Sequence, residues 1–295
     1  MSTTQTTAAI AMLRVPGARL YYEVRGSGPA LLCIPGGPTD AGIFSDVAER
    51  LADRYTVVNY DPRGHSRSPL DGEPGDIAVS QHADDAAALI RAVGDEPANV
   101  YGSSGGGTIG LDLVARHPEL VDTLVAHEAP LTELLPDAAD LRSKGEEILE
   151  IYRTHGAFAA IEKFGALVEE GGPRYSEEMA RAEPTPESQE TGARMAGNFD
   201  LFLAHEIRQI GAYVPDFDLL RSASTRIVSA AGETSGEQLA RRAALALAGR
   251  LDIPVTYLPG GHGGWGSDPQ EFADRLHEAI RGGDVENVRP APTPS

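Results

Sequence analysis

Residues 98–110 read ANVYGSSGGGTIG, a short apolar strand pattern followed by a segment with helical spacing. Gly102, Ser104 and Gly106 fit G-x-S-x-G, in which a serine stands on a strained turn between a strand and a helix. The competing interpretation, a glycine-rich phosphate turn, lacks the lysine of G-x-x-x-x-G-K-[ST]. We therefore predict a nucleophile at Ser104. Ser103 is its nearest rival, but only Ser104 has glycine two residues before and two residues after it.

Strand and helix patterns alternate on both sides of this motif. Strands are predicted at 18–24, 30–35, 55–61, 98–103, 121–128, 225–231 and 252–259. Helices are predicted at 43–53, 76–94, 105–118 and 268–282. This alternation indicates an α/β fold with a mostly parallel, doubly wound sheet.

A helical segment without strand patterns interrupts the alternation, which indicates one domain with a cap inserted into it. The predicted divisions are a first core part, the helical cap, a second core part and a disordered tail, at 10–131, 132–218, 219–282 and 283–295. The tail is assigned on its glycine and proline content.

Charge and composition narrow the class of protein. The 295 residues carry a formal net charge of -19, which argues against nucleic acid and anionic membrane surfaces as partners. The N-terminal stretch lacks the features of a signal peptide, and no apolar run is long enough to span a membrane. We expect a soluble cytoplasmic protein, and the sequence leaves a homodimer open. The single cysteine, Cys33, lies in an apolar run and is predicted to be a core residue.

A second glycine-rich loop, IPGGPTD at 34–40, follows an early predicted strand. In nucleophile-elbow enzymes, such a loop supplies one N–H group to the developing oxyanion, and the residue after the nucleophile supplies the other. We assign these donors to Gly37 and Gly105. A tight turn is the plainer interpretation of IPGGP, and the two are compatible.

The order of these motifs resembles the α/β-hydrolase superfamily. A GGP loop, DPRGHSRS at 61–68, the GSSGG turn, an inserted segment and a late PGGH follow one another over roughly residues 15–281. The resemblance implies a catalytic base on the loop after the last strand, where His262 lies in LPGGH at 258–262. The other seven histidines are predicted to be structural by default, including His65, although His205 in the insertion could touch substrate.

The acid of the triad has two candidates. The family commonly carries G-x-x-D after the next-to-last strand, but here Ser235 occupies the aspartate position. Glu128 ends the strand that follows the nucleophile helix, which is the other place known in this fold. We predict Glu128 as the acid, because it would lie beside Ser104 at the edge of a parallel sheet. Glu233 is kept as the alternative.

Within the superfamily, the chain is similar to fungal zearalenone hydrolases, which are lactonases. The similar motifs are the elbow serine, the H-E-x-P stretch at 127–130, LPGGH at 258–262 and the oxyanion loop. The chain departs from them in the cap. Their cap tryptophan has no counterpart, since the single tryptophan is Trp265 beside the base, and Phe202 lies near the equivalent position.

The cap is predicted to act as a lid. Met195, Phe199 and Phe202 are spaced as one apolar stripe of a helix, which indicates an apolar substrate. The predicted substrate contacts are Gly36, Pro38, Ser103, Met195, Phe199, Phe202, His205 and Trp265. The expected activity is hydrolysis of a small apolar carboxylic ester or lactone through an acyl-enzyme, with no metal or organic cofactor. Amide, thioester or C–C bond hydrolysis by the same triad, and a hydrolase-fold binding protein, remain the alternatives.

Overall fold

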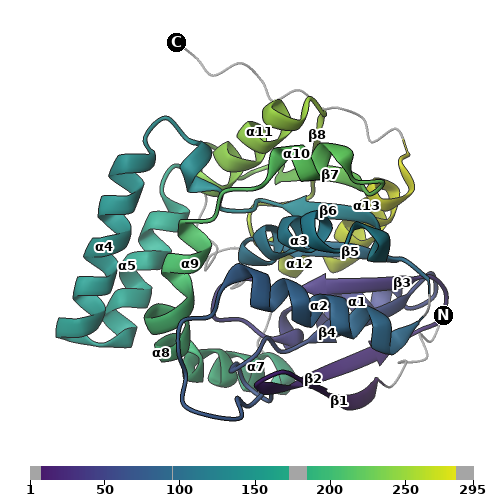
Figure 1. Ribbon diagram of the computed structural model, residues 1–295, viewed down its shortest axis with the longest axis horizontal. Coiled ribbons are helices and arrows are strands. Elements are labelled where there is room, and N and C mark those ends of the chain that lie inside the picture. Colours follow the sequence, from purple (N-terminus) through teal and green to yellow (C-terminus); the bar gives the residue numbers. More distant parts are fainter. Residues whose placement is uncertain (1–7, 95, 173–184, 284–295) are drawn as a thin grey trace.

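An eight-stranded sheet organises the computed structural model, which describes residues 8–94, 96–172 and 185–283 (Figure 1). Its strands are β1 (Ala9–Val15), β2 (Ala18–Arg25), β3 (Ala30–Ile34), β4 (Thr56–Tyr60), β5 (Ala98–Ser103), β6 (Val121–His127), β7 (Arg226–Gly232) and β8 (Val255–Leu258). The order across the sheet is β1-β2-β4-β3-β5-β6-β7-β8. The pairs β1–β2 and β2–β4 are antiparallel, and the later pairs are parallel. The predicted α/β-hydrolase fold with a mostly parallel sheet is confirmed.

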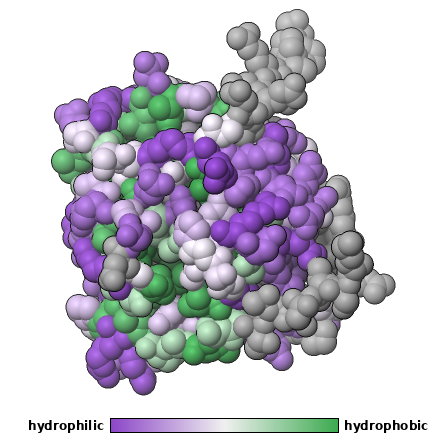
Figure 2. Space-filling model, turned by 90° about the vertical axis from the view of Figure 1, so that its right-hand side faces the viewer, coloured by the Kyte–Doolittle hydropathy of each residue, from purple (hydrophilic) through white to green (hydrophobic). Residues whose placement is uncertain are grey.

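β1 is a strand that the sequence pattern does not predict. Its outward positions include the apolar residues Ile10 and Met12, which are 64% and 48% exposed. These side chains hide the alternation of polar and apolar residues by which a half-buried strand is recognised. On the face of the molecule remote from the cap, apolar groups gather low down, where β1 and β2 lie, with a smaller apolar area at the upper left (Figures 1 and 2).

Helices cover both faces of the sheet. One face packs against α2 (Val79–Val93), α3 (Gly105–Arg116), α10 (Phe217–Ser222) and α11 (Leu239–Leu251). The other face packs against α1 (Ser45–Leu51), α12 (Gly264–Ser267) and α13 (Pro269–Arg281). Short 3₁₀ turns lie at η1 (Ala41–Phe44), η2 (Pro118–Leu120) and η3 (Thr132–Leu134). Cys33 is buried on the second face, as predicted, and burial raises the pKa of its thiol to about 12.

The inserted cap lies at one end of the sheet (left in Figure 1). It consists of α4 (Ala138–His155), α5 (Ala157–Glu169), α7 (Pro186–Gly197), α8 (Phe199–Leu201), the π-helix η4 (Phe202–Glu206) and α9 (Ile207–Gly211). The described part of this insertion contains no strand, as the sequence predicts. The predicted cap boundary at residue 218 falls inside α10, which packs against α3 on the core. The predicted tail lies, apart from Gly283, outside the described residues.

The ends of three parallel strands position the residues that matter for chemistry. Ser104 directly follows β5, Glu128 directly follows β6, and His262 lies four residues after the end of β8. Carboxyl ends of parallel strands meet at one edge of a sheet, which is where open α/β folds bind ligands. Among the described residues, no helix is long and apolar enough to cross a membrane.

Candidate active site

Ser104 lies on a strained turn between β5 and α3. Its backbone has φ 54° and ψ -125°, a region that side-chain-bearing residues rarely adopt. The Ser104 N–H donates to the carbonyl oxygen of His127 at 2.8 Å, which ties the turn to β6. A Cβ atom at Gly106 would lie 2.0 Å from the carbonyl oxygen of Ile34, so this position requires glycine. The G-x-S-x-G pattern therefore has a steric cause here.

The glycine-rich loop after β3 approaches this turn closely. A Cβ at Gly36 would lie 2.6 Å from the Gly105 backbone nitrogen, so a larger residue would push the loop away. Gly37 has φ 58°, and a Cβ at Gly105 would lie 3.5 Å from the Gly37 nitrogen. Gly37, Ser104 and Gly105 line the same cavity. Since the first N–H groups of a helix have no acceptor within it, the Gly105 N–H is suited to a bound anion.

His262 and Glu128 form a close pair. The His262 Nδ1 lies 2.7 Å from Glu128 Oε2, and the Gly232 N–H donates to Glu128 Oε1 at 2.9 Å. Glu128 is 0% exposed and has φ 50°, and its own N–H donates to the Ala230 carbonyl oxygen at 2.9 Å. Both carboxylate oxygens are therefore engaged, and the imidazole is held with Nδ1–H toward Glu128. In this tautomer the Nε2 atom of His262 can accept a proton.

The Glu128 carboxylate is held in its ionised form. Burial would raise its pKa, but the hydrogen bond from His262 and the positive charge that His262 can carry outweigh burial. The nearby Ser235 hydroxyl acts in the same direction, and the net result lowers the pKa of Glu128 to about 2. A carboxylate that is charged at neutral pH can stabilise the imidazolium that forms when His262 takes up a proton.

The alternative acid, Glu233, is not brought to the histidine. Its side chain is exposed, and its backbone N–H donates to the Leu258 carbonyl oxygen at 2.9 Å. Ser235, at the family's usual aspartate position, is completely buried. Ser235 thus occupies the position at which the family commonly has an aspartate. The negative charge beside His262 comes instead from Glu128 at the end of β6.

His127, the neighbour of Glu128, is buried among aromatic rings. Its Nδ1 lies 3.1 Å from the hydroxyl oxygen of Tyr101, and its ring stacks on the ring of His262 with centroids 6.4 Å apart. Trp265 and Phe272 contact it edge to face at 6.1 and 5.9 Å. Burial lowers the pKa of His127 to about 4, and the charge that His262 can carry adds to the lowering, although Glu128 opposes it. A neutral His127 leaves the imidazolium form of His262 without a like charge beside it.

This lowered pKa predicts a pH dependence of stability. A histidine of pKa 6.5 when unfolded and about 4 when folded favours folding above pH 6.5, and this contribution is lost as the pH falls toward 4. We expect it to supply about 2 kcal/mol of the unfolding free energy lost between pH 7 and pH 5. In urea titrations at both pH values, a folded His127→Gln variant should lose about 2 kcal/mol less than the wild type over this interval. Equal losses would contradict a neutral His127.

A cavity of about 650 Å³ opens above Ser104 and His262 between the core and the cap. Its lining is mainly apolar. The apolar side chains are Leu141, Ile148, Leu149, Phe164, Leu167, Val168, Phe202, Ile207, Ile210 and Leu239. The size is that of a site for a small organic molecule.

Two arginines lie at the wall of this cavity, and each has an acidic partner. Arg142 contacts Glu133 at 2.5 Å, and Arg208 contacts Glu146 at 2.8 Å. Their charges are thus neutralised locally, and their side chains are more than half exposed. The cavity therefore offers its ligand mainly apolar contacts near the triad.

Of the predicted substrate contacts, Phe202 lines the cavity and the other seven do not. The predicted helical stripe through Met195, Phe199 and Phe202 is wrong, because α7 ends at Gly197 and a π-helix begins at Phe202. Phe199 packs instead on Phe158, with ring centroids 5.5 Å apart.

The remaining predicted contacts have other places. Trp265 is 4% exposed and packs into the aromatic cluster behind His262. His205 lies 3.5 Å from Asp76 and lines a separate pocket of about 240 Å³. Gly36, Pro38 and Ser103 lie behind the cavity wall, in the loop and strand that hold Gly37 and Ser104. These residues support the site without lining it.

The cavity residues of α4, α5 and α11 were not predicted. Ile148 and Leu149 on α4 and Phe164 and Leu167 on α5 line it. The only sequence signal was the apolar character of AFAAIEKFGALVE at 157–169, which does not say whether a side chain packs or lines a cavity. Among the described residues, no cluster of three or more His, Cys, Asp or Glu side chains could hold a metal ion.

Comparisons with known proteins agree with this geometry. Residues 29–155 match the alpha/beta hydrolase fold family. The chain is 38% identical to the uncharacterized hydrolase YraK of Bacillus subtilis (strain 168), covering 91% of this chain and 94% of that protein. It is 30% identical to the 2-(acetamidomethylene)succinate hydrolase of Mesorhizobium japonicum (strain LMG 29417 / CECT 9101 / MAFF 303099), covering 84% and 86%. The chain belongs to the α/β-hydrolase family and is a hydrolase.

Solved structures show the same fold at low identity. A thermophilic esterase from Thermogutta terrifontis superposes with a TM-score of 0.70 at 20% identity, over 95% of this chain and 99% of that one. Est816, described as an N-acyl homoserine lactone degrading enzyme, superposes with a TM-score of 0.66 at 23% identity, over 90% and 99%. At these identities the likeness concerns the fold.

Proposed function

We propose that the protein is a serine hydrolase of carboxylic esters or lactones that carry an apolar acyl group. The observation that carries the proposal is the 2.7 Å contact between His262 Nδ1 and the buried Glu128 carboxylate, beside a cavity that also exposes Ser104. A nucleophile, a base and a group that orients the base are the three parts of this chemistry.

In the proposed acylation, the Ser104 hydroxyl oxygen attacks the substrate carbonyl carbon while His262 Nε2 takes the hydroxyl proton. The carbonyl oxygen gains the negative charge and accepts hydrogen bonds from the Gly37 and Gly105 N–H groups. Glu128 stabilises the imidazolium. His262 then donates the proton to the leaving alcohol oxygen as the C–O bond breaks, which leaves an acyl-enzyme.

Deacylation repeats these steps with water. His262 takes a proton from the water, whose oxygen attacks the acyl carbonyl carbon, and the same two N–H groups hold the second oxyanion. Collapse of this intermediate breaks the bond to Ser104, and His262 returns a proton to the serine oxygen. With a lactone, the alcohol remains attached to the acyl chain and both leave as one hydroxy acid.

The apolar cavity supports the substrate class. Aliphatic and aromatic side chains would hold an acyl chain or ring, whereas a dicarboxylate such as the one named for the Mesorhizobium relative would face arginines that already have acidic partners. The resemblance to zearalenone-type lactonases in H-E-x-P and LPGGH supports lactones within this class. Small aromatic and aliphatic lactones are therefore included in the proposal.

Two assays test the proposal. A fluorophosphonate probe should label wild-type protein at Ser104, located by peptide mass spectrometry, and a panel of p-nitrophenyl esters and lactones should be turned over. A hydrolase-fold binding protein would leave the probe unreacted. If anilides, thioesters or 1,3-diketones are cleaved with higher kcat/KM than any ester or lactone, the same triad serves amide, thioester or C–C bond hydrolysis and the proposed substrate class is wrong.

Acyl-chain length provides a quantitative prediction. Each buried CH₂ contributes about 0.8 kcal/mol, so kcat/KM for p-nitrophenyl esters should rise by on the order of 10² from acetate to hexanoate. An Ile148→Trp variant fills the cavity between α4 and α5 and should flatten this rise. Val214→Trp, at a 57% exposed position, is the matched control and should keep the wild-type slope. A wild-type slope in folded Ile148→Trp would place the acyl chain elsewhere.

A further inference from the structure

The oxyanion loop, defined as residues 35–40, is held from the cap. The Asn198 side-chain nitrogen donates to the Pro38 carbonyl oxygen at 3.1 Å. The Arg194 Nε donates to Asp40 Oδ2 at 2.6 Å. Both cap residues belong to the end of α7 or the turn after it, more than 150 positions from the loop in sequence. The cap thus contacts the loop directly on the C-terminal side of Gly37.

Asn198 is placed to fix the loop to the core as well. It is 3% exposed, and its Oδ1 accepts a hydrogen bond from the Ser66 N–H at 2.8 Å. Its Nδ2 also donates to the Ser66 hydroxyl oxygen at 3.0 Å. The Asn198 side chain therefore joins the loop after β4 to the oxyanion loop. Its Oδ1 accepts a hydrogen bond from the first loop, and its Nδ2 donates one to the second.

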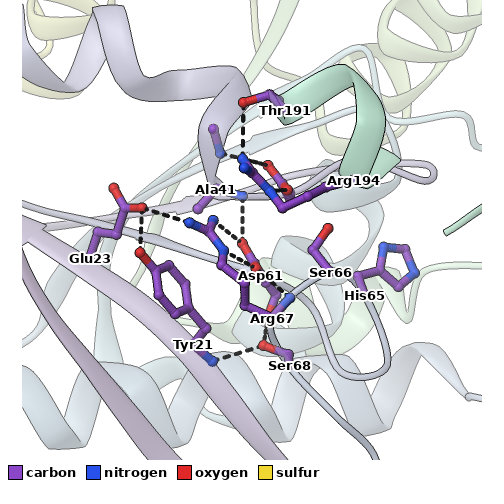
Figure 3. A network of polar contacts seen from close by, with 12 residues as sticks. Tyr21, Glu23, Ala41, Asp61, His65, Ser66, Arg67, Ser68, Thr191 and Arg194 are labelled. Atoms are coloured by element: carbon purple, nitrogen blue, oxygen red, sulfur yellow. Dashed lines mark hydrogen bonds and ion pairs between the residues drawn. The ribbon is translucent and has the colours of Figure 1, made fainter. Parts of the chain in front are cut away.

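Arg194 supplies a second attachment (Figure 3). Its partner Asp40 is completely buried and accepts the Gly42 N–H at 2.8 Å, which begins the turn η1. Thr191 on the same cap helix contacts Arg194 at 3.0 Å, and Figure 3 shows both directed at this segment. On the core side, the Ala41 N–H donates to the buried Asp61 at 3.0 Å.

A third attachment runs through a buried histidine. His65 Nδ1 lies 3.2 Å from the Thr39 carbonyl oxygen, and His65 Nε2 lies 2.9 Å from Glu206 on the π-helix of the cap. Both side chains are almost fully buried. Since Glu206 holds the pKa of His65 above its ordinary value despite burial, this contact has the character of an ion pair. Pro38 and Asp40 thus each contact a cap residue directly. Thr39 is linked to the cap through His65.

Gly37 has no side chain that could fix its conformation. It has φ 58°, and no atom lies within 4 Å of the position its Cβ would take. Glycine adopts a wider range of backbone conformations than other residues, so the conformation of Gly37 depends on how its flanks are held. An oxyanion donor, in contrast, stabilises the transition state only if it is held in place before the reaction. The residues after Gly37 must therefore supply the rigidity.

We propose that Asn198 and Arg194 are positioning residues that hold the Gly37 N–H toward the oxyanion, so that the cap completes the oxyanion hole as well as covering the substrate. The inference rests on the proposed function. It predicts that loosening these contacts weakens binding of the transition state while leaving binding of the ground-state ester largely unchanged.

Asn198→Asp is the sharpest test, because the variant keeps the acceptor for the Ser66 N–H and loses the donor to Pro38. We expect kcat for p-nitrophenyl butyrate to fall about 10- to 100-fold, below the roughly 10²- to 10³-fold loss of an entire oxyanion donor. KM should stay within about twofold, as for an interaction made only in the transition state. The inhibition constant of an aryl trifluoromethyl ketone, which forms an oxyanion on Ser104, should rise by the factor by which kcat/KM falls.

A matched variant separates positioning from general loss of structure. Arg242→Gln removes an ion pair between α11 and Asp137 beside the cap without touching the oxyanion loop, and should retain wild-type kcat. Arg194→Gln gives a second approach if Asn198→Asp does not fold, with an expected loss of about tenfold in kcat at similar KM.

Unchanged kcat in folded Asn198→Asp and Arg194→Gln would overturn the inference, as would a fall in kcat without weaker binding of the ketone. These outcomes leave the proposed function intact, because the wild type would still hydrolyse the ester and react at Ser104. A wild type that neither hydrolyses esters or lactones nor reacts with the fluorophosphonate would reject the proposed function, and the inference with it.

Discussion

Ser104→Ala is expected to retain the fold and the cavity and to lose on the order of 10⁶ in kcat toward p-nitrophenyl esters. The loss reflects the missing nucleophile, since the substitution removes one oxygen atom and leaves the apolar lining in place. Alanine keeps the same backbone demand at φ 54°, so the strain of the turn is unchanged. The variant should therefore show a melting temperature close to that of the wild type.

The measurement needs a control for the neighbouring serine. Ser103 is 1% exposed and does not line the cavity, so Ser103→Ala should keep both fluorophosphonate labelling and at least a tenth of the wild-type kcat. Single-turnover assays at high enzyme concentration exclude trace wild-type protein as the source of residual rate. Ester hydrolysis by Ser104→Ala within tenfold of the wild type would contradict an acyl-enzyme at this residue.

Glu128→Gln is expected to lower kcat by about 10⁴, or roughly 5.5 kcal/mol of barrier, with KM little changed. The substitution keeps the size of the side chain and an oxygen that can accept the Gly232 N–H. It removes the negative charge from His262 Nδ1, so the imidazole loses both its tautomeric bias and the partner of its charged form.

Glu233→Gln is the matched control for this prediction. It changes the same chemical group on an exposed residue that directly follows β7, and its kcat should stay within about twofold of the wild type. The reverse ordering, with Glu233→Gln inactive and Glu128→Gln active, would show that the loop rearranges to bring Glu233 to His262. The two variants thus decide between the two candidate acids without reference to a relative.

The triad candidates could be predicted because each depends on its place in the chain. Ser104 lies between glycines that can be recognised in the sequence. Because these glycines lack side chains, the backbone of the turn can lie in contact with β3. Glu128 and His262 follow directly or closely after apolar strands, and parallel strands bring such positions to one edge. The substitution of serine for aspartate at Ser235 then left one buried carboxylate within reach of the histidine.

The lining of the cavity could not be predicted in the same way. Successive helical residues differ by about 100° in direction, so an interruption of a helix changes which side chains lie on one face. α7 ends at Gly197, and Phe202, which lines the cavity, therefore belongs to a later helical segment than Met195. The opposite wall, from α4 and α5, depends on how two amphipathic helices pack together, and their apolar residues look alike in sequence.

The sequence by itself determined seven of the eight strands of the described sheet, the strained serine turn and the places of the histidine and glutamate after strands, because steric limits and strand ends are local properties of the chain. Only the tertiary structure decided that Glu128 rather than Glu233 contacts His262, that the cavity is apolar with paired arginines, and that Asn198 and Arg194 hold the oxyanion loop. These contacts join segments that are tens to more than 150 residues apart, and their existence depends on how the cap packs onto the core.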